Sequence, residues 1–242
     1  MRNRKSILKF AAAFLTGAVI FTSCIDDPEP PELTVLPDAF VQKQVQNGVE
    51  KYGVVFWILG NKEIQTVTVE GPGDASWTLE GDNSTSRVFS LFPEDEDYVL
   101  VKPAQGDYKF TVKSKQADEA AITVVDKLES AELDAMVIDT TQFVNSKLKT
   151  IWEPVEDADA YLVRMYNQSN KLVFMGPKVG KTTTNYSFGM ADQGWTPGMT
   201  AESGKTYKVE VLALLYESTS SASDKEYNIQ FISLASTNVV WD

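Results

Sequence analysis

Residues 148–155, LKTIWEPV, are followed by the acidic connection EDADA at 156–160 and by the stretch YLVRMY at 161–166. Much later, residues 204–213 read GKTYKVEVLA. The three longer stretches are interpreted as β-strands, and the first two are consecutive strands joined by the acidic connection. The acidic connection is rich in turn-forming Asp and is short, so it predicts a tight turn between two consecutive strands.

This pattern resembles a fibronectin type III domain over roughly residues 128–235. That family has a tryptophan on its second strand, a proline in the turn that follows, a tyrosine opening the third strand, and a Tyr-x-Val-x-Val-x-Ala strand near its end. The matching positions here are Trp152, Pro154, Tyr161, Tyr207, Val209, Val211 and Ala213. The resemblance implies that Trp152, Tyr161 and Tyr207 lie in the core. It also implies that Tyr207 is a tyrosine corner, whose hydroxyl bonds to nearby backbone.

The first half of the chain carries a related but weaker pattern. Residues 77–81, WTLEG, precede a late stretch at 106–112, GDYKFTV, and a clean alternation runs over residues 65–70. This arrangement resembles PKD-type or other immunoglobulin-like domains, and it implies that Trp77 and Tyr108 belong to a core. We therefore expect an all-β protein with two tandem β-sandwich domains, at residues 33–126 and 127–242. The connection between them has no Gly/Ser-rich linker, so the two domains are expected to touch.

Cys24 is the single cysteine of the chain and ends a segment typical of a signal peptide. Residues 1–9 are basic without an acid, residues 10–21 are uncharged and apolar, and small residues follow. The Thr22-Ser23-Cys24 ending resembles a bacterial lipobox, which implies cleavage after residue 23 and acyl chains on Cys24. Alternatively, an ordinary secretory signal would leave Cys24 as a free thiol, which is unusual in an exported protein.

Residues 24–32 form an acidic, proline-rich tether. Prolines favour an extended spacer, so one interpretation is a solvated stalk. The segment also resembles the acidic tract that follows the lipid cysteine in Bacteroides-type surface lipoproteins. That resemblance implies a lipid-anchored protein exposed at the cell surface. Because Ile25 rather than Asp follows the lipid cysteine, we expect the anchor to lie in the outer membrane.

The composition of the chain excludes several classes of catalytic site and disfavours some binding partners. The formal net charge is −12, which disfavours nucleic acid and anionic lipid surfaces as partners. The chain has no histidine, which excludes a Ser-His-Asp triad and zinc sites built on imidazole. No spacing selects a pair of carboxylates for glycoside hydrolysis. We therefore predict no enzyme activity, no cofactor and no metal site, with a glycoside hydrolase as a remote alternative.

Two acidic runs and one loop tryptophan are the remaining candidate sites. Residues 94–97, EDED, are interpreted as a solvated turn, with calcium binding as the alternative. Residues 156–159 are interpreted as turn formers. Trp195 lies in the loop GWTPG at 194–198 and is either a contact for a sugar ring or a protein partner, or a cap on the end of the sandwich. Trp57 stands in an apolar run and is expected to be buried.

Two functions follow as hypotheses. The first is a protein-interaction or structural module on the bacterial surface. The second is an accessory glycan-binding lipoprotein of a saccharide uptake system. The glycan hypothesis requires at least two aromatic side chains on one open face, whereas the interaction hypothesis requires an apolar patch or an unpaired edge strand.

Overall fold

The first and last strands of the described chain both belong to one large β-sheet. The computed structural model describes residues 31–81, 86–218 and 228–242. The predicted signal peptide and Cys24 lie outside the described residues. Within them, nearly every regular element is a strand, so the predicted all-β fold is confirmed. No helix in the described ranges is long and apolar enough to cross a membrane.

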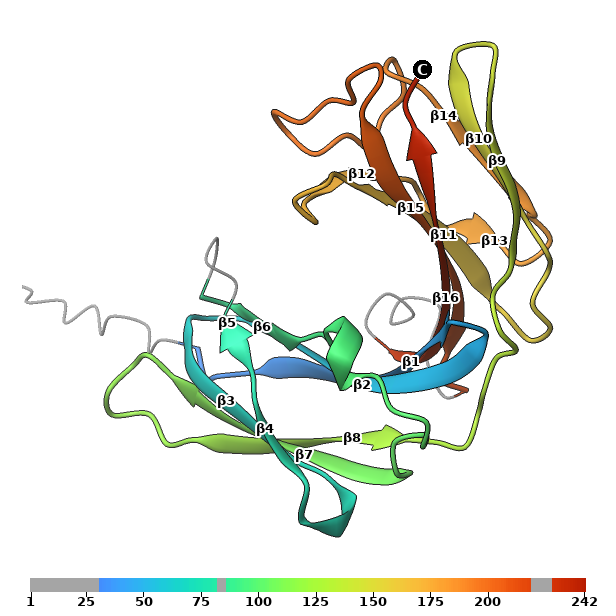
Figure 1. Ribbon diagram of the computed structural model, residues 1–242. Helices are drawn as coiled ribbons and strands as arrows, with labels where there is room; N and C mark the ends of the chain where they lie inside the picture. Colours follow the sequence, from blue (N-terminus) through green and yellow to red (C-terminus); the bar gives the residue numbers. More distant parts are fainter. Residues whose placement is uncertain (1–30, 82–85, 219–227) are drawn as a thin grey trace, which may run out of the picture. The chain divides into compact units, whose positions relative to one another are not determined.

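The large sheet has nine strands (Figure 1). Its order is β12 (Leu172–Met175), β11 (Ala160–Tyr166), β15 (Thr206–Tyr216), β16 (Ile229–Val240), β1 (Val35–Gln46), β2 (Val49–Gly60), β6 (Val88–Leu91) and β5 (Glu80–Gly81), with β13 (Val179–Gly180) also paired to β11. All these pairings are antiparallel except that of β1 with β16, which is parallel.

Two smaller sheets complete the fold. One has four strands in the order β4 (Ser76–Thr78), β3 (Ile64–Glu70), β7 (Gly106–Ser114) and β8 (Ile122–Leu128). The other has three strands in the order β14 (Asn185–Phe188), β10 (Lys147–Trp152) and β9 (Ile138–Val144). Two short 3₁₀ turns, η1 (Pro72–Asp74) and η2 (Asp95–Asp97), interrupt the loops.

The parallel pairing of β1 with β16 joins the two predicted sandwiches through one sheet. Its register runs from Val41 opposite Phe231 to Gln44 opposite Leu234. The expected boundary at residues 126 and 127 falls inside β8, and residues 33–242 form one compact unit. The connection after β8 is also packed, because Leu133 is fully buried and the Met136 N–H donates to Ser233 Oγ at 2.8 Å.

The tyrosines singled out from the sequence hold turns together. Trp152 and Tyr161 are buried against each other, with ring centroids 5.5 Å apart. The Val155 N–H donates to the Tyr161 hydroxyl at 2.8 Å, and the Glu202 N–H donates to the Tyr207 hydroxyl at 2.9 Å. Tyr207 therefore has the hydroxyl-to-backbone bond of a tyrosine corner.

The first half of the chain has a similar arrangement. The buried Tyr108 hydroxyl donates to the Ala104 carbonyl at 2.8 Å, four residues back along the chain. Trp77 is half-buried, with its ring centroid 4.9 Å from that of the buried Phe56. An aromatic cluster thus fills the space between the large sheet and the four-stranded sheet.

Candidate functional site

The large sheet has apolar side chains on both of its faces. On β15, Val211 and Ala213 belong to the main core, whereas Leu212 and Leu214 belong to a second buried cluster. Successive side chains of a strand point to opposite faces, so this second cluster lies on the face away from the main core. The other buried residues of the second cluster are Phe40, Val55, Ala160, Tyr216, Ile232 and Leu234.

A hollow of about 410 Å³ lies on this second face. Its apolar lining comes from β1, β2, β11, β12, β15 and β16 and from the loop after β6, through Phe40, Trp57, Phe92, Leu162, Met175, Leu212, Leu214, Ile229 and Ile232. Phe92 and Met175 are 52% and 46% exposed. Trp57, expected inside from its apolar run, is instead half-buried at this hollow, because Phe56 and Ile58 beside it take the core face.

A second, polar hollow of about 370 Å³ adjoins the first, because Phe92 and Arg164 line both. Arg164 Nη2 lies 2.8 Å from Glu210 Oε2, and Lys208 Nζ lies 3.0 Å from Glu210 Oε1. Both cations also face the ring of Tyr166, at 5.5 and 5.0 Å from its centroid. The buried Glu210 carboxylate therefore holds two neighbouring cations in a fixed polar wall.

Tyr98 closes one side of this polar hollow. Burial, followed by the charge of Glu210, raises the pKa of the Tyr98 hydroxyl well above its usual range. The hydroxyl stays protonated at neutral pH and can act as a hydrogen-bond donor. The polar hollow thus offers the neutral Tyr98 hydroxyl as a donor, beside Arg164 and Lys208 that are already paired with Glu210.

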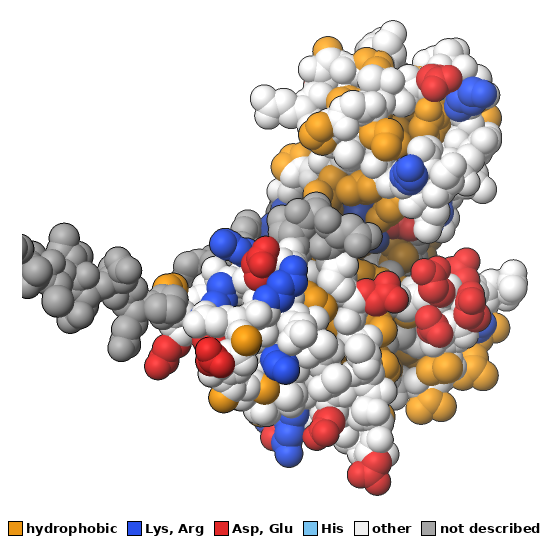
Figure 2. Space-filling model, turned by 90° about the vertical axis from the view of Figure 1, so that its left-hand side faces the viewer, with side chains coloured by type: hydrophobic (Ala, Val, Ile, Leu, Met, Phe, Trp, Pro, Cys, Tyr) orange, Lys and Arg blue, Asp and Glu red, His pale blue; other side chains and the backbone are white. Residues whose placement is uncertain are grey.

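The acidic run at residues 94–97 forms the turn η2 at the rim of the polar hollow. Asp97 Oδ2 accepts the Glu94 N–H at 2.9 Å, and the Glu94 side chain accepts the Asp97 N–H. The four acidic side chains are exposed, and the next apolar residues, Val99, Leu100 and Val101, are exposed as well. Figure 2 shows acidic side chains gathered beside hydrophobic ones on one flank of this face.

Trp195 lies away from both hollows and packs against the end of the second half of the chain. Its ring meets those of Phe174, Phe188 and Trp241 in edge contacts with centroids 5.3–6.1 Å apart. Its Nε1–H donates to the Gly189 carbonyl at 3.2 Å, and the residue is half-buried. A Cβ atom added at Gly194 would lie 2.5 Å from the carbonyl oxygen of Met175, which is too close for any side chain. The loop that contains Gly194 therefore packs directly against β12. Trp195 thus has the contacts of a structural cap.

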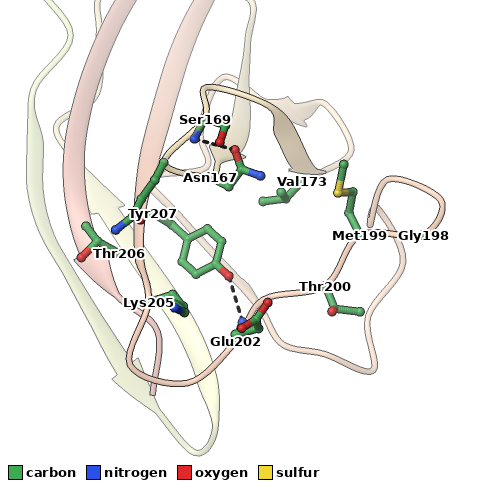
Figure 3. A pocket seen from close by; sticks show the side chains of 11 residues that line it. Asn167, Ser169, Val173, Gly198, Met199, Thr200, Glu202, Lys205, Thr206 and Tyr207 are labelled. Atoms are coloured by element: carbon green, nitrogen blue, oxygen red, sulfur yellow. Dashed lines mark hydrogen bonds between the residues drawn. The ribbon is translucent and has the colours of Figure 1, made fainter.

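A small pocket of about 300 Å³ lies beside this cap (Figure 3). Val173, Met199, Glu202 and Tyr207 line it, and the Tyr207 hydroxyl points to the Glu202 backbone. Asn167 Oδ1, also at this pocket, accepts the N–H groups of Ser169 and Lys171 at 3.0 Å. Several of its polar groups are thus occupied in holding the surrounding loops.

The fold brings together three carboxylates that the sequence does not single out. Asp38 on β1, Asp126 on β8 and Glu217 after β15 each place an oxygen within 4.8 Å of the others. Burial is the main cause that raises the pKa of Asp38 well above its usual value, and it also raises the pKa of Asp126. Burial and the charge of Asp126 raise the pKa of Glu217 to about 7. These residues are far apart in the sequence, so no local motif could reveal them.

Comparisons with known proteins found similar solved structures. No family model matches the chain, and no curated protein is significantly similar to it. A two-domain fibronectin type III segment of chicken tenascin is 10% identical, with coverage of 82% of this chain and 97% of that chain and a TM-score of 0.28. A DUF3823 family protein from Bacteroides uniformis is 9% identical, with coverage of 86% and 100% and a TM-score of 0.32.

A β-1,2-glucanase from Parabacteroides distasonis is 11% identical, with a TM-score of 0.29, and the alignment covers 86% of this chain but 36% of that chain. All these similarities are too low to assign a function to this chain.

Proposed function

We propose that this chain is a non-catalytic interaction module, anchored to a membrane by lipid on Cys24, and that the adjoining hollows of the large sheet bind a protein segment. The observation that carries the proposal is the apolar hollow, to which most strands of the large sheet contribute. Exposed apolar side chains gathered in one concave site are typical of protein interaction surfaces.

The rim of the hollows indicates the charge of the partner. The turn η2 contributes Glu94 and Asp95 to the polar hollow, and Asp97 and Glu96 are exposed beside them. Arg164 and Lys208 are already paired with Glu210. The chain as a whole has a net charge of −12. A segment with apolar side chains flanked by Lys or Arg is therefore the complementary partner.

A peptide-display selection against the purified protein tests this proposal. We expect enriched peptides that combine apolar residues with Lys or Arg, and their affinity should fall as salt is raised. Trp57→Ala and Phe92→Ala should weaken binding, whereas Val125→Ala removes an exposed apolar side chain on β8 and should not. Enrichment no better than on an unrelated protein, or equal binding to all three variants, would overturn the proposal.

Glycan binding is the second candidate, and one observation favours it. Trp57 and Phe92 both line the apolar hollow, and the side chains of Gln42 and Gln44 line the adjoining polar hollow. Aromatic faces beside amides and hydroxyls suit a saccharide. Binding of an oligosaccharide that Trp57→Ala abolishes, with no peptide enriched, would select this function over the first.

A further inference from the structure

The carboxylate cluster of Asp38, Asp126 and Glu217 stands at the junction of the two halves of the chain. Asp126 Oδ2 accepts the Ala39 N–H at 2.6 Å, and Asp38 Oδ2 accepts the Ile229 N–H at 3.2 Å. Asp126 and Glu217 also share a side-chain hydrogen bond. The cluster therefore links β1, β8 and the start of β16, which belong to different parts of the sequence.

Asp38 has a buried oxygen that hydrogen bonding leaves unsatisfied. Its side chain is 2% exposed, and among the described residues its Oδ1 has no hydrogen-bond partner. A buried carboxylate oxygen without a partner costs free energy unless a proton or a cation neutralises it. This oxygen belongs to a carboxyl group whose neighbours are two further carboxyl groups.

The charged groups around Asp38 and Asp126 are acidic. Asp126 and Glu217 act on Asp38, and Glu129 acts on Glu217. Within the described ranges, neither Asp38 nor Asp126 forms a salt bridge with a Lys or Arg. The buried Asp38 and the half-buried Asp126 therefore lack the basic partner that buried acids usually have.

We propose that Asp38, Asp126 and Glu217 form a divalent-cation site that suits calcium. The ligands are all carboxylate oxygens, which Ca²⁺ prefers and which suit zinc less well than nitrogen or sulfur. The three carboxylates each place an oxygen within 4.8 Å of the others, so one cation can contact all of them. Ca²⁺ accepts flexible coordination by carboxylates, whereas Mg²⁺ requires near-ideal octahedral geometry and keeps several of its waters.

An acidic cavity reaches the Glu217 side of this site. It has a volume of about 360 Å³, and Glu129, Asp159 and Glu217 are among the residues that line it. Carboxylates along a cavity concentrate cations locally and speed their entry. Backbone carbonyls or water would supply the remaining ligands that Ca²⁺ requires. A bound ion would fasten β1 and β8 to the base of the β15–β16 hairpin.

Titration calorimetry of the chelator-treated protein with CaCl₂ at neutral pH tests the site. We expect one bound ion and a higher melting temperature with CaCl₂ than with chelator. Glu217→Gln, at the half-buried edge of the cluster, should weaken the affinity at least about tenfold, because it removes one charged ligand. MgCl₂ at the same concentration should bind more weakly.

A matched control separates this site from the exposed acidic turn η2. Asp95→Asn with Asp97→Asn removes two acidic charges of that turn and should leave the calcium affinity unchanged. Circular dichroism of each variant establishes that it is folded. No heat of binding in the folded wild-type protein would overturn the proposal. The three carboxyl groups would then be neutralised by shared protons and not by a cation. Binding that Glu217→Gln leaves intact, or that the η2 variant abolishes, would also overturn it.

Discussion

Arg164 on β11 and Glu210 on β15 lie opposite each other in the register of the large sheet, and they form a two-pronged contact. Arg164 Nε and Nη2 both donate to Glu210 Oε2, at 3.2 and 2.8 Å. The Glu210 side chain is 6% exposed, so its charge depends on this contact and on Lys208. Arg164 lines both the apolar and the polar hollow, and Glu210 lines the polar one.

Loss of the arginine should therefore destabilise the protein. Arg164→Met keeps most of the side-chain volume but leaves Glu210 with Lys208 alone, and it should lower the free energy of unfolding by about 1.5–3 kcal/mol. Urea denaturation measures the change. Lys147→Met, which breaks the more exposed pair with Asp192, is the control and should cost less than about 1 kcal/mol. Equal costs for both substitutions would contradict the role assigned to the buried pair.

The shared sheet predicts that the two halves of the chain unfold together. Phe231 on β16 is fully buried and lies opposite Val41 on β1. Phe231→Ala should lower the free energy of unfolding by about 3–5 kcal/mol, because it opens a cavity at the junction. Tryptophan fluorescence and far-ultraviolet circular dichroism should report one shared urea transition before and after the substitution. Two separated transitions, with only one shifted by Phe231→Ala, would contradict a common sheet.

Acid should loosen the Trp195 cap. The contact with Lys147, followed by the Gly189 N–H, lowers the pKa of Asp192. A depressed pKa means that this carboxylate stabilises the fold above its unfolded pKa, and that the contribution is lost as pH falls through the lower folded value. Gly189 also accepts the Trp195 Nε1–H, so iodide quenching of Trp195 should rise on acidification.

The comparison with Asp192→Asn isolates this group. The variant should be quenched more than wild type at neutral pH, and the difference should vanish below the folded pKa of Asp192. A single-tryptophan background, with the other four tryptophans replaced by Phe, assigns the signal to Trp195. A difference that persists or grows in acid would contradict the assignment.

The lipid anchor predicts a simple change in location. Cys24→Ala removes the proposed site of acylation, so the protein should leave the membrane fraction or remain unprocessed. Fractionation of the cell envelope and the mass of the mature N-terminus measure both outcomes. Membrane retention of a wild-type protein whose Cys24 is unmodified would rule out the lipoprotein assignment.

The sequence predicted the local elements better than their partners. The stretches expected as strands at residues 148–155, 161–166 and 204–213 cover most of β10, β11 and β15, and the pattern around Tyr207 predicted its bond to the backbone. Alternation tells which face of a strand is apolar, but it does not tell which strand lies beside it. The parallel pairing of β1 with β16 joins residues near both ends of the chain, so no local pattern could predict it.

The candidate sites could not be predicted for the same reason, because they depend on which strands lie side by side. Trp57 and Leu212 lie in runs that are apolar on both faces, which are typical of a strand covered on two sides. Such a run does not tell which side opens into a hollow. Trp195 was a candidate contact residue because its loop is rich in glycine and proline. In the fold its ring instead packs against the rings of Phe174 and Trp241. Only the arrangement of strands distinguishes these two kinds of tryptophan.

The binding role of the apolar hollow can be tested by methyl NMR of the protein labelled at its methionine methyl groups, during titration with a selected peptide. Met175 lines the hollow and is 46% exposed, whereas Met190, in the loop after β14, is 47% exposed and provides a matched control. The interaction proposal predicts that the Met175 signal shifts in proportion to bound peptide while Met190 stays in place. Shifts of Met190, or of Met199 in the pocket of Figure 3, with an unchanged Met175 would contradict it.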